Sequence, residues 1–543
     1  MRASPFDMKA DIILKNANIW TVDGRQPRAQ ALAISESQIA AVGSNEEIEV
    51  LVGPETRVMD LHGRLVLPGF NDCHTHFVTA ALRSATNVDL YGASSMEEVQ
   101  TRLRQFSESH PEHDWLDGMR WFPTRINEGV WPTRADLDAV EPTRPVVIFD
   151  IDGHTCWTNT AAIERKGYTA ATRDPDGGQI LRDESGYPSG IFFENAQEAF
   201  ERYSPVTAGE FPALFRGEVA KLNRLGITSL SNNGIKPDHL NQIERMAAEN
   251  ELHLRISEWP FLFDGLEKAI ELRERFAKNE KIHVDTVKIM FDGVMSNYSA
   301  WMLEPYADNP SETGYPLAAP EQVLPLVIKA DRAGFQVASH VIGTRAVRTM
   351  LDIYEQAQQA NGTQSSRHRL EHVEASHPDD RLRFADLGVI SSMTPLHCTA
   401  DLEGYYISRL GENGHYGFAW RSFLNQGVHL AFGTDWPAVD LKEPSPLEQI
   451  FGAVTRCTPK NYGKLKWHLE QCITVEEAIR SYTLESAYAE RREHRKGSIT
   501  RGKLADLIVL SEDILEAPPE RLLETKVLLT LFDGEIVFEQ EAF

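Results

Sequence analysis

Two histidines separated by one residue, His74 and His76, directly follow the apolar stretch LVLPGFNDC. Residues two apart in a strand point to the same face, so the two imidazoles would converge. Neutral imidazole nitrogens are common ligands of divalent metal ions. Taken alone, the pair fits either a metal site at the end of a strand or two surface histidines.

Four other side chains that suit a metal site lie in or at the end of predicted strands. They are Lys288 within VDTVKIMFDG, His340 after FQVAS, His372 after HRLE and Asp435 after LAFGT. Each of them alone could be a hydrogen-bonded core residue or a carboxylate at a barrel rim. The carboxyl ends of parallel barrel strands meet at one face, so together these residues predict a shared metal site.

Lys288 is an unusual member of this set because an ammonium group donates hydrogen bonds and accepts none. Beside cations in a buried site its pKa falls, and the neutral amine can capture CO2 as a carbamate that bridges two metal ions. The alternative is an unmodified lysine that pairs with Asp292 or with a substrate anion. The sequence leaves both options open.

The elements that would position these residues alternate between short apolar runs and amphipathic helical stretches, which is typical of βαβ units. Eight strands are predicted, at 64–70, 145–152, 226–233, 284–293, 334–343, 367–374, 388–395 and 428–436. Eight strand and helix repeats predict an α/β protein with a (β/α)8 TIM-like barrel.

The two ends of the chain have a different character, with short alternating strands and glycine-containing turns. Residues 1–66 and 491–543 are predicted to pair into one small β-sandwich. Residues 67–490 would form the barrel. Irregular segments rich in Trp, Pro, Gly and Asp, around 89–145 and 172–215, predict inserted caps near the substrate opening.

Composition excludes several classes of protein. The chain has 80 acidic and 55 basic residues and a net charge of -25, which disfavours nucleic acid and anionic membranes as partners. Because neither a membrane-spanning apolar run nor a signal peptide is evident, we expect a cytoplasmic location. Five cysteines without CxxC spacing argue against a disulfide framework, and Cys73 is interpreted as a packed thiol.

Motifs along nearly the whole chain share one order with a known family: PGFNDCHTHF, GHTCWTN, VKIMFDG, HVIGTRAV, LEHVE, SMTP, FGTDWP and GSITRGKLADLIVL. The sequence resembles the amidohydrolase superfamily, and within it the YtcJ-like group of family 3 that includes N-substituted formamide deformylases. The resemblance implies a small-molecule substrate. One departure is Thr344, where the family usually carries an acidic residue.

By this resemblance, His74, His76 and Asp435 would hold one metal, and His340 and His372 the other, with carboxylated Lys288 and a hydroxide between them. One or two ions, zinc or another divalent metal, are compatible with this ligand framework. The metal would lower the pKa of its water towards about 7 and polarise a carbonyl. Asp435 would carry the proton to the leaving amine.

The predicted reaction is hydrolysis of a C–N bond, an amide or N-formyl group, in a small molecule. The alternatives are a cyclic amide, carbamate, ester or heterocycle that is deaminated, and a regulatory homologue without catalysis. The last option is disfavoured because all six predicted ligand residues are present. The oligomeric state stays open, with a homodimer among the options.

Further residues are candidates for substrate contact. His154 in GHTCWTN could donate a hydrogen bond to a substrate carbonyl and assist catalysis, or it could make a structural contact. Glu194 could contact substrate or metal, although an ion pair is favoured. Among four tryptophans, Trp121, Trp131, Trp157 and Trp301, one or two are expected to line an apolar pocket, with Trp121 and Trp157 as candidates, while the rest fill cores.

Overall fold

The computed structural model describes residues 9–541 apart from 127–129, 202–205, 208, 363–365, 401–404 and 465. Two parallel sheets carry the central part of the fold, with the strand orders β17-β16-β15-β8 and β18-β19-β20-β21-β22. The strands are β8 (Phe70–Thr75), β15 (Ile227–Asn233), β16 (Arg255–Trp259), β17 (Ile282–His283), β18 (Thr286–Met290), β19 (Gln336–Val341), β20 (Arg369–His372), β21 (Ile390–Met393) and β22 (Leu430–Phe432). Almost every residue in them is buried, as expected for strands covered on both faces.

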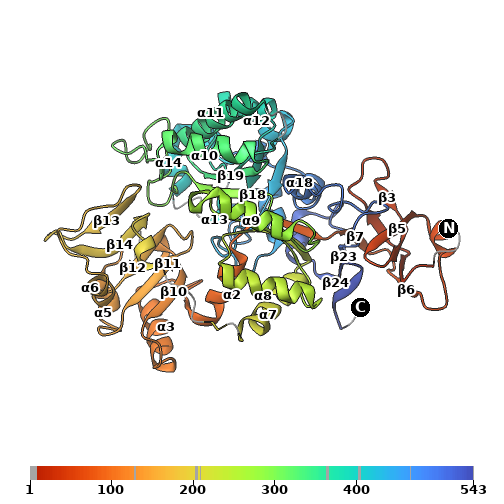
Figure 1. Cartoon of the computed structure of the whole chain (residues 1–543), viewed down its shortest axis with the longest axis horizontal. Coiled ribbons are helices and arrows are strands. Elements are labelled where there is room, and N and C mark those ends of the chain that lie inside the picture. The colour runs from red at the N-terminus through yellow and green to blue at the C-terminus, as the bar shows by residue number, and fades with distance from the viewer. Residues whose placement is uncertain are drawn as a thin grey trace.

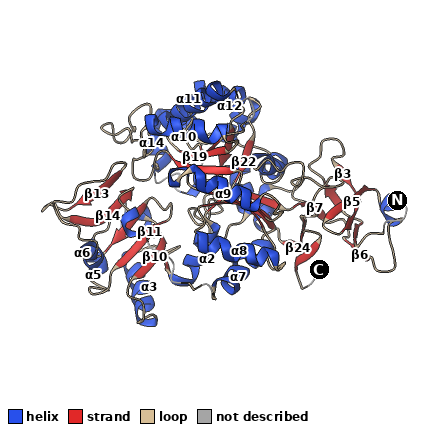
Figure 2. Cartoon of the chain, in the orientation of Figure 1, coloured by secondary structure: helices blue, strands red, loops and turns tan. Residues whose placement is uncertain are grey.

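Helices lie on both sides of these strands (Figures 1 and 2). They include α2 (Phe77–Thr86), α7 (Phe211–Arg224), α8 (Pro237–Ala248), α9 (Leu266–Phe276), α10 (Pro320–Arg332), α11 (Thr344–Asn361), α12 (Pro378–Leu387), α16 (Pro446–Thr455), α17 (Val475–Ser481) and α18 (Leu484–Ala489). Proline opens several of them because its fixed φ suits the first helical turn. Gly362 and Gly388 end α11 and α12 in the left-handed conformation.

The two parallel sheets meet at two seams. At one of them the backbone N–H of Lys288 donates to the carbonyl oxygen of Pro260 at 2.9 Å. At the other, the N–H of Asp435 donates to the oxygen of His74 and the N–H of His76 donates to the oxygen of Trp436, both at 2.8 Å. These contacts bring the carboxyl ends of β8 and β22 together, where candidate ligands follow both strands.

The structure corrects two of the predicted barrel strands. The apolar run at 145–152 forms β11 (Val146–Asp150), which belongs to a separate sheet. The parallel sheet instead contains β16 (Arg255–Trp259), a strand that the sequence did not predict. The sequence RISEW of β16 carries charged and polar residues that are buried, so hydrophobic periodicity did not reveal it. The stretch 64–70 is also divided, with β7 (Leu65–Pro68) in a third sheet and β8 beginning at Phe70.

A six-stranded sheet of order β13-β14-β12-β11-β10-β9 forms a lateral unit beside the parallel sheets (Figure 1). Its strands are β9 (Val88–Asp89), β10 (Leu116–Trp121), β11, β12 (Thr155–Thr158), β13 (Gly178–Arg182) and β14 (Pro188–Glu194). Both predicted cap segments contribute strands to this one sheet. The lateral unit, as we call residues 88–194, supplies part of the site described below.

Residues from both ends of the chain share a third region, which lies opposite the lateral unit (Figure 1). Its two sheets have the orders β5-β4-β1-β6 and β25-β24-β23-β7-β2-β3. The strands are β1 (Ile12–Lys15), β2 (Asn18–Trp20), β3 (Arg28–Ala29), β4 (Ala31–Ser35), β5 (Gln38–Gly43), β6 (Arg57–Asp60), β7, β23 (Leu507–Leu510), β24 (Val527–Phe532) and β25 (Glu535–Glu539). Leu14 and Ile34 of the first sheet and Leu507 and Leu531 of the second share one apolar cluster. None of the described helices has the length and apolar content that a bilayer-spanning helix requires.

Candidate active site

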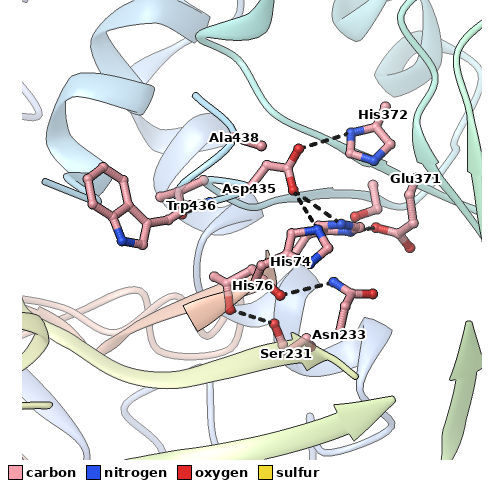
Figure 3. Close-up of polar contacts among 12 residues, drawn as sticks. His74, His76, Ser231, Asn233, Glu371, His372, Asp435, Trp436 and Ala438 are labelled. Carbon is pink, nitrogen blue, oxygen red and sulfur yellow. Dashed lines mark hydrogen bonds and ion pairs between the residues drawn. The ribbon is translucent and has the colours of Figure 1, made fainter. Parts of the chain in front are cut away.

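Asp435 lies at the centre of a cluster of histidines, of which His74 and His372 are buried and His76 is partly exposed (Figure 3). Its Oδ1 is 3.4 Å from Nε2 of His74 and 3.5 Å from Nε2 of His76. Its Oδ2 is 3.7 Å from Nδ1 of His372. The structure therefore brings three predicted metal ligands, from β8, the residue that follows it and the end of β20, to the carboxylate of a fourth in the loop after β22.

The local backbone turns these residues inward at the strand ends. Both Asp435 (φ 57°) and His372 (φ 71°) adopt the left-handed conformation, which non-glycine residues rarely do outside turns and functional sites. The backbone hydrogen bond from Asp435 to His74 holds the loop after β22 against the end of β8. Ligands distant in sequence are thus fixed by short-range contacts.

The donor set fits a divalent metal ion. His74, His76 and Asp435 each offer one ligand atom, and these atoms lie within 4.8 Å of one another. Among the described residues, Oδ1 of Asp435 is buried and has no hydrogen-bond partner. A buried carboxylate oxygen without a donor is costly unless a cation neutralises it.

The imidazoles are suited to coordination because burial favours their neutral form. Burial, together with nearby His74 and Lys288, lowers the pKa of His76 well below its ordinary value. Burial and the neighbouring His340 do the same to the pKa of His372. A neutral ring leaves one nitrogen lone pair free for a metal.

His74 is oriented by a buried ion pair that sequence reasoning missed. Its Nδ1 lies 2.6 Å from Oε2 of Glu371, while Nε of Arg369 donates to Oε1 of Glu371 at 2.7 Å. Although burial opposes ionisation, Arg369 and His74 lower the pKa of Glu371 to about 2. An ionised Glu371 accepts the Nδ1 proton of His74 and leaves Nε2 as the coordinating nitrogen. The motif LEHVE contained this residue, but only its histidine was singled out.

Lys288 is buried with its Nζ 3.4 Å from Nε2 of His74. Burial lowers the pKa of Lys288 to about 8, against the opposing effect of Glu371 and Asp435. Among the described residues no ion pair joins Lys288 to Asp292, whose carboxylate accepts three backbone N–H groups, each at 2.9 Å. Lys288 therefore belongs to the His74 and Asp435 cluster.

Two further histidines, His340 and His397, lie beside His372 and could each be a metal ligand. His340 lies with its ring centroid 4.4 Å from that of His372, but its nitrogens fall outside both groups of potential ligands found among the described residues. His397 belongs to the second group, with Nε2 3.6 Å from Oδ2 of Asp435. The motif SMTP ends at Pro395, two residues before His397, which sequence reasoning missed.

The hydrogen bonds of His397 argue against its use as a ligand. Its Nε2 lies 2.8 Å from the carbonyl oxygen of Ala438, which can only accept, so Nε2 carries a proton. Its Nδ1 lies 3.2 Å from Oε1 of Glu374. Both nitrogens are therefore engaged with protein acceptors.

We expect His397→Gln to retain the metal content of the unsubstituted protein, because neither nitrogen of His397 is free. His372→Gln is the matched variant and should lose metal, since Nδ1 of His372 lies 3.7 Å from Oδ2 of Asp435 and its ring accepts or donates no hydrogen bond within the described residues. Metal content after gel filtration, measured by plasma mass spectrometry, checks both. A loss of bound metal in His397→Gln comparable to that in His372→Gln would make His397 a ligand.

The lateral unit contributes His154 to the site. Nδ1 of His154 lies 2.6 Å from Oε2 of Glu194, whose Oε1 accepts from Asn297 at 3.0 Å and from Ser299 at 2.5 Å. Burial opposes protonation, but Glu194 raises the pKa of His154 to about 9. Glu194 therefore makes the ion pair favoured from the sequence, and it holds His154 5.0 Å from the ring of His340.

A pocket opens over Asp435, His372 and His154, and it is lined by Phe122, Tyr405 and Val439 among others. The structure does not bring Trp121 or Trp157 to this pocket, which corrects their assignment as substrate contacts. Both are fully buried in an apolar core of the lateral unit, against which Trp131 also packs. Trp301 packs against the main core and is not among the lining residues.

Two further residues noted in the sequence, Cys73 and Thr344, make structural contacts away from the metal ligands. Cys73 is buried and unpaired, with Sγ 3.3 Å from the hydroxyl of Ser392, in agreement with a packed thiol. Thr344 begins α11, and its hydroxyl accepts the backbone N–H of Leu303 at 2.9 Å. The departure from the family pattern at Thr344 is therefore accommodated by a loop contact.

A family model described as "Amidohydrolase family" matches residues 57–538. The chain belongs to the amidohydrolase family. This amidohydrolase is 30% identical over 531 residues to protein LONG AFTER FAR-RED 3 of Arabidopsis thaliana, covering 93% of this chain and 88% of the relative. It is 29% identical to YtcJ of Bacillus subtilis, covering 96% and 98%, and 28% identical to N-substituted formamide deformylase of Arthrobacter pascens, covering 98% of each.

Among solved structures, the amidohydrolase is similar to an uncharacterized metal-dependent hydrolase of Pyrococcus horikoshii. The TM-score is 0.73 at 25% identity, over 94% of this chain and 99% of the other. This likeness supports an α/β, TIM-barrel-like fold for the parallel sheets.

Proposed function

We propose that this amidohydrolase is a metal-dependent hydrolase that cleaves a C–N bond, an amide or an N-formyl group, in a small molecule. The observation that carries the proposal is the position of Asp435 between two sets of histidines, with a buried oxygen for which the described part of the chain offers no hydrogen bond. The formamide deformylase among its relatives supports the choice of bond.

His74, His76 and Asp435 would hold one divalent ion, for which zinc is the first candidate given the imidazole ligands. If two ions bind, His372 and His340 would hold the second ion. Lys288 would then lie between the two metal sites. A Lys288 pKa of about 8 leaves part of the amine neutral near pH 7, so it can add to CO2 and form a carbamate with release of a proton.

The bound metal would lower the pKa of a coordinated water towards about 7 and polarise the substrate carbonyl. Asp435 would accept the proton of the attacking water at its carboxylate and deliver it to the leaving nitrogen. His154, held at Nδ1 by Glu194, would donate from Nε2 to the substrate carbonyl oxygen as negative charge develops there. Glu194 is then a positioning residue, because it acts through His154.

The same site could also serve a cyclic amide, carbamate, ester or amino heterocycle, and substrate panels distinguish these. The test of the proposal is metal analysis combined with an activity screen on N-formyl and N-acyl amines. We expect about one or two equivalents of zinc or a similar metal per chain, and loss of hydrolysis after dialysis against a chelator that added Zn²⁺ reverses. Full activity in metal-free protein would refute the proposal.

A further inference from the structure

The wall of the pocket beyond the histidine cluster is largely apolar. Phe122 and Ile151 from the lateral unit line it together with Val294, Tyr405 and Val439 from the loops of the parallel sheets. Apolar walls of this kind bind the hydrocarbon part of a ligand, while a few polar groups set its orientation. The identity of those polar groups therefore bears on which substrates the pocket accepts.

Apart from its histidines, the ionisable side chains of this wall are mainly carboxylates. Beyond Asp435 they are Asp152, Glu374 and Asp440, and the described lining residues include neither lysine nor arginine. Asp440 is occupied by Arg125, whose guanidinium donates to both carboxylate oxygens at 2.6 and 3.3 Å. Asp152 and Glu374 remain as the carboxylates available to a ligand.

Each of these two carboxylates keeps acceptor capacity. Asp152 accepts the backbone N–H of His154 at 3.0 Å on one oxygen and the hydroxyl of Ser296 at 2.6 Å on the other. It also shares a hydrogen bond with the buried Asp150, because burial and the charge of Asp152 raise the pKa of Asp150 well above its ordinary value and keep that carboxyl group protonated. Glu374 accepts the hydroxyl of Tyr406 at 2.6 Å on one oxygen and faces Nδ1 of His397 with the other. A carboxylate oxygen has two lone pairs, so a further N–H donor can bind to either side chain.

The two histidines beside these carboxylates do not offer an unmatched positive charge to a ligand. His154 is paired with Glu194 at 2.6 Å, and His397 is paired with Glu374 at 3.2 Å. Recognition of a free carboxylate usually depends on arginine or lysine, which the described lining does not provide. A substrate carboxylate at this wall would instead meet Asp152 and Glu374.

We propose that the pocket selects substrates whose non-reacting end is apolar and either uncharged or positively charged, and that it rejects substrates with a carboxylate at that end. Asp152 is the specificity-determining residue that receives the ammonium or N–H group. This inference rests on the proposed function, which identifies the amide or N-formyl group as the end of the substrate that reacts. It adds the charge class of the substrate, which the family assignment leaves open.

The test uses three formamides that share one skeleton, N-benzylformamide and its 4-aminomethyl and 4-carboxy derivatives, with the metal-loaded enzyme. We expect kcat/KM for the neutral and cationic compounds to exceed that of the anionic compound by on the order of 100-fold, because like charges at close range in a pocket are strongly unfavourable. Equal or faster hydrolysis of the carboxylate compound would overturn the proposal.

Asp152→Asn tests the assigned residue because it removes the negative charge at nearly constant shape. The asparagine oxygen can still accept the N–H of His154, and its NH2 group can donate to the hydroxyl of Ser296. We expect the ratio of kcat/KM for the cationic over the neutral compound to fall about tenfold. The matched control is Asp379→Asn on α12, whose carboxylate is 82% exposed, and its ratio should not change. An unchanged ratio in Asp152→Asn would remove Asp152 from this role.

Binding of the same three compounds, measured by calorimetry, separates the two proposals. If none of them is hydrolysed but the anionic compound still binds most weakly, the assigned reaction fails and the charge selection stands. If all are hydrolysed with no charge order in binding or kcat/KM, the selection fails and the reaction stands.

Discussion

Asp435→Asn is expected to lower kcat by about 1,000-fold or more while the protein remains folded. The amide cannot take a proton from water, and it is a poorer metal ligand than a carboxylate. The fold should tolerate the change for two reasons. Asparagine adopts the left-handed conformation readily, as position 435 requires at φ 57°, and the affected Oδ1 has no hydrogen-bond partner among the described residues.

The measurement is kcat at saturating substrate with Zn²⁺ present, accompanied by metal content and a thermal melt. The control is again Asp379→Asn, where the charge is removed from an exposed carboxylate. If Asp435→Asn binds normal metal and loses turnover, proton transfer is the missing function. Near-normal turnover would assign the proton carrier to another residue.

Glu371→Gln is expected to weaken metal binding by about 10- to 100-fold, because Glu371 holds the coordinating tautomer of His74. It should also reduce the free energy of unfolding by about 3 kcal/mol, since the fully buried Arg369 loses its counter-charge. Zinc affinity, from competition with a chromophoric chelator, and thermal unfolding of the apoprotein measure the two effects separately.

A surface ion pair provides the matched control. Asp352 pairs with Arg383, and its side chain is 52% exposed, so Asp352→Asn should change the free energy of unfolding by less than about 1 kcal/mol and leave zinc affinity unaltered. Loss of stability in Glu371→Gln with unchanged zinc affinity would limit Glu371 to a structural role.

Part of the site could be predicted because strand geometry is local. The spacing of His74 and His76, and the placement of His372 and Asp435 after apolar runs, follow from alternation along a strand and from the convergence of parallel strand ends. The structure brings these four together. Their assignment as metal ligands stays a prediction that metal analysis can test.

The sequence by itself determined the family, the alternation of strands and helices and the types of side chain at the strand ends, because those properties reside in short segments. Only the tertiary structure decided that Val146–Asp150 joins the lateral sheet, that Trp121 and Trp157 pack inside that unit, and that Glu371 reaches His74. The physical reason is that burial and pairing depend on residues tens to hundreds of positions away. An apolar run or a buried carboxylate has the same local pattern whichever partner it meets.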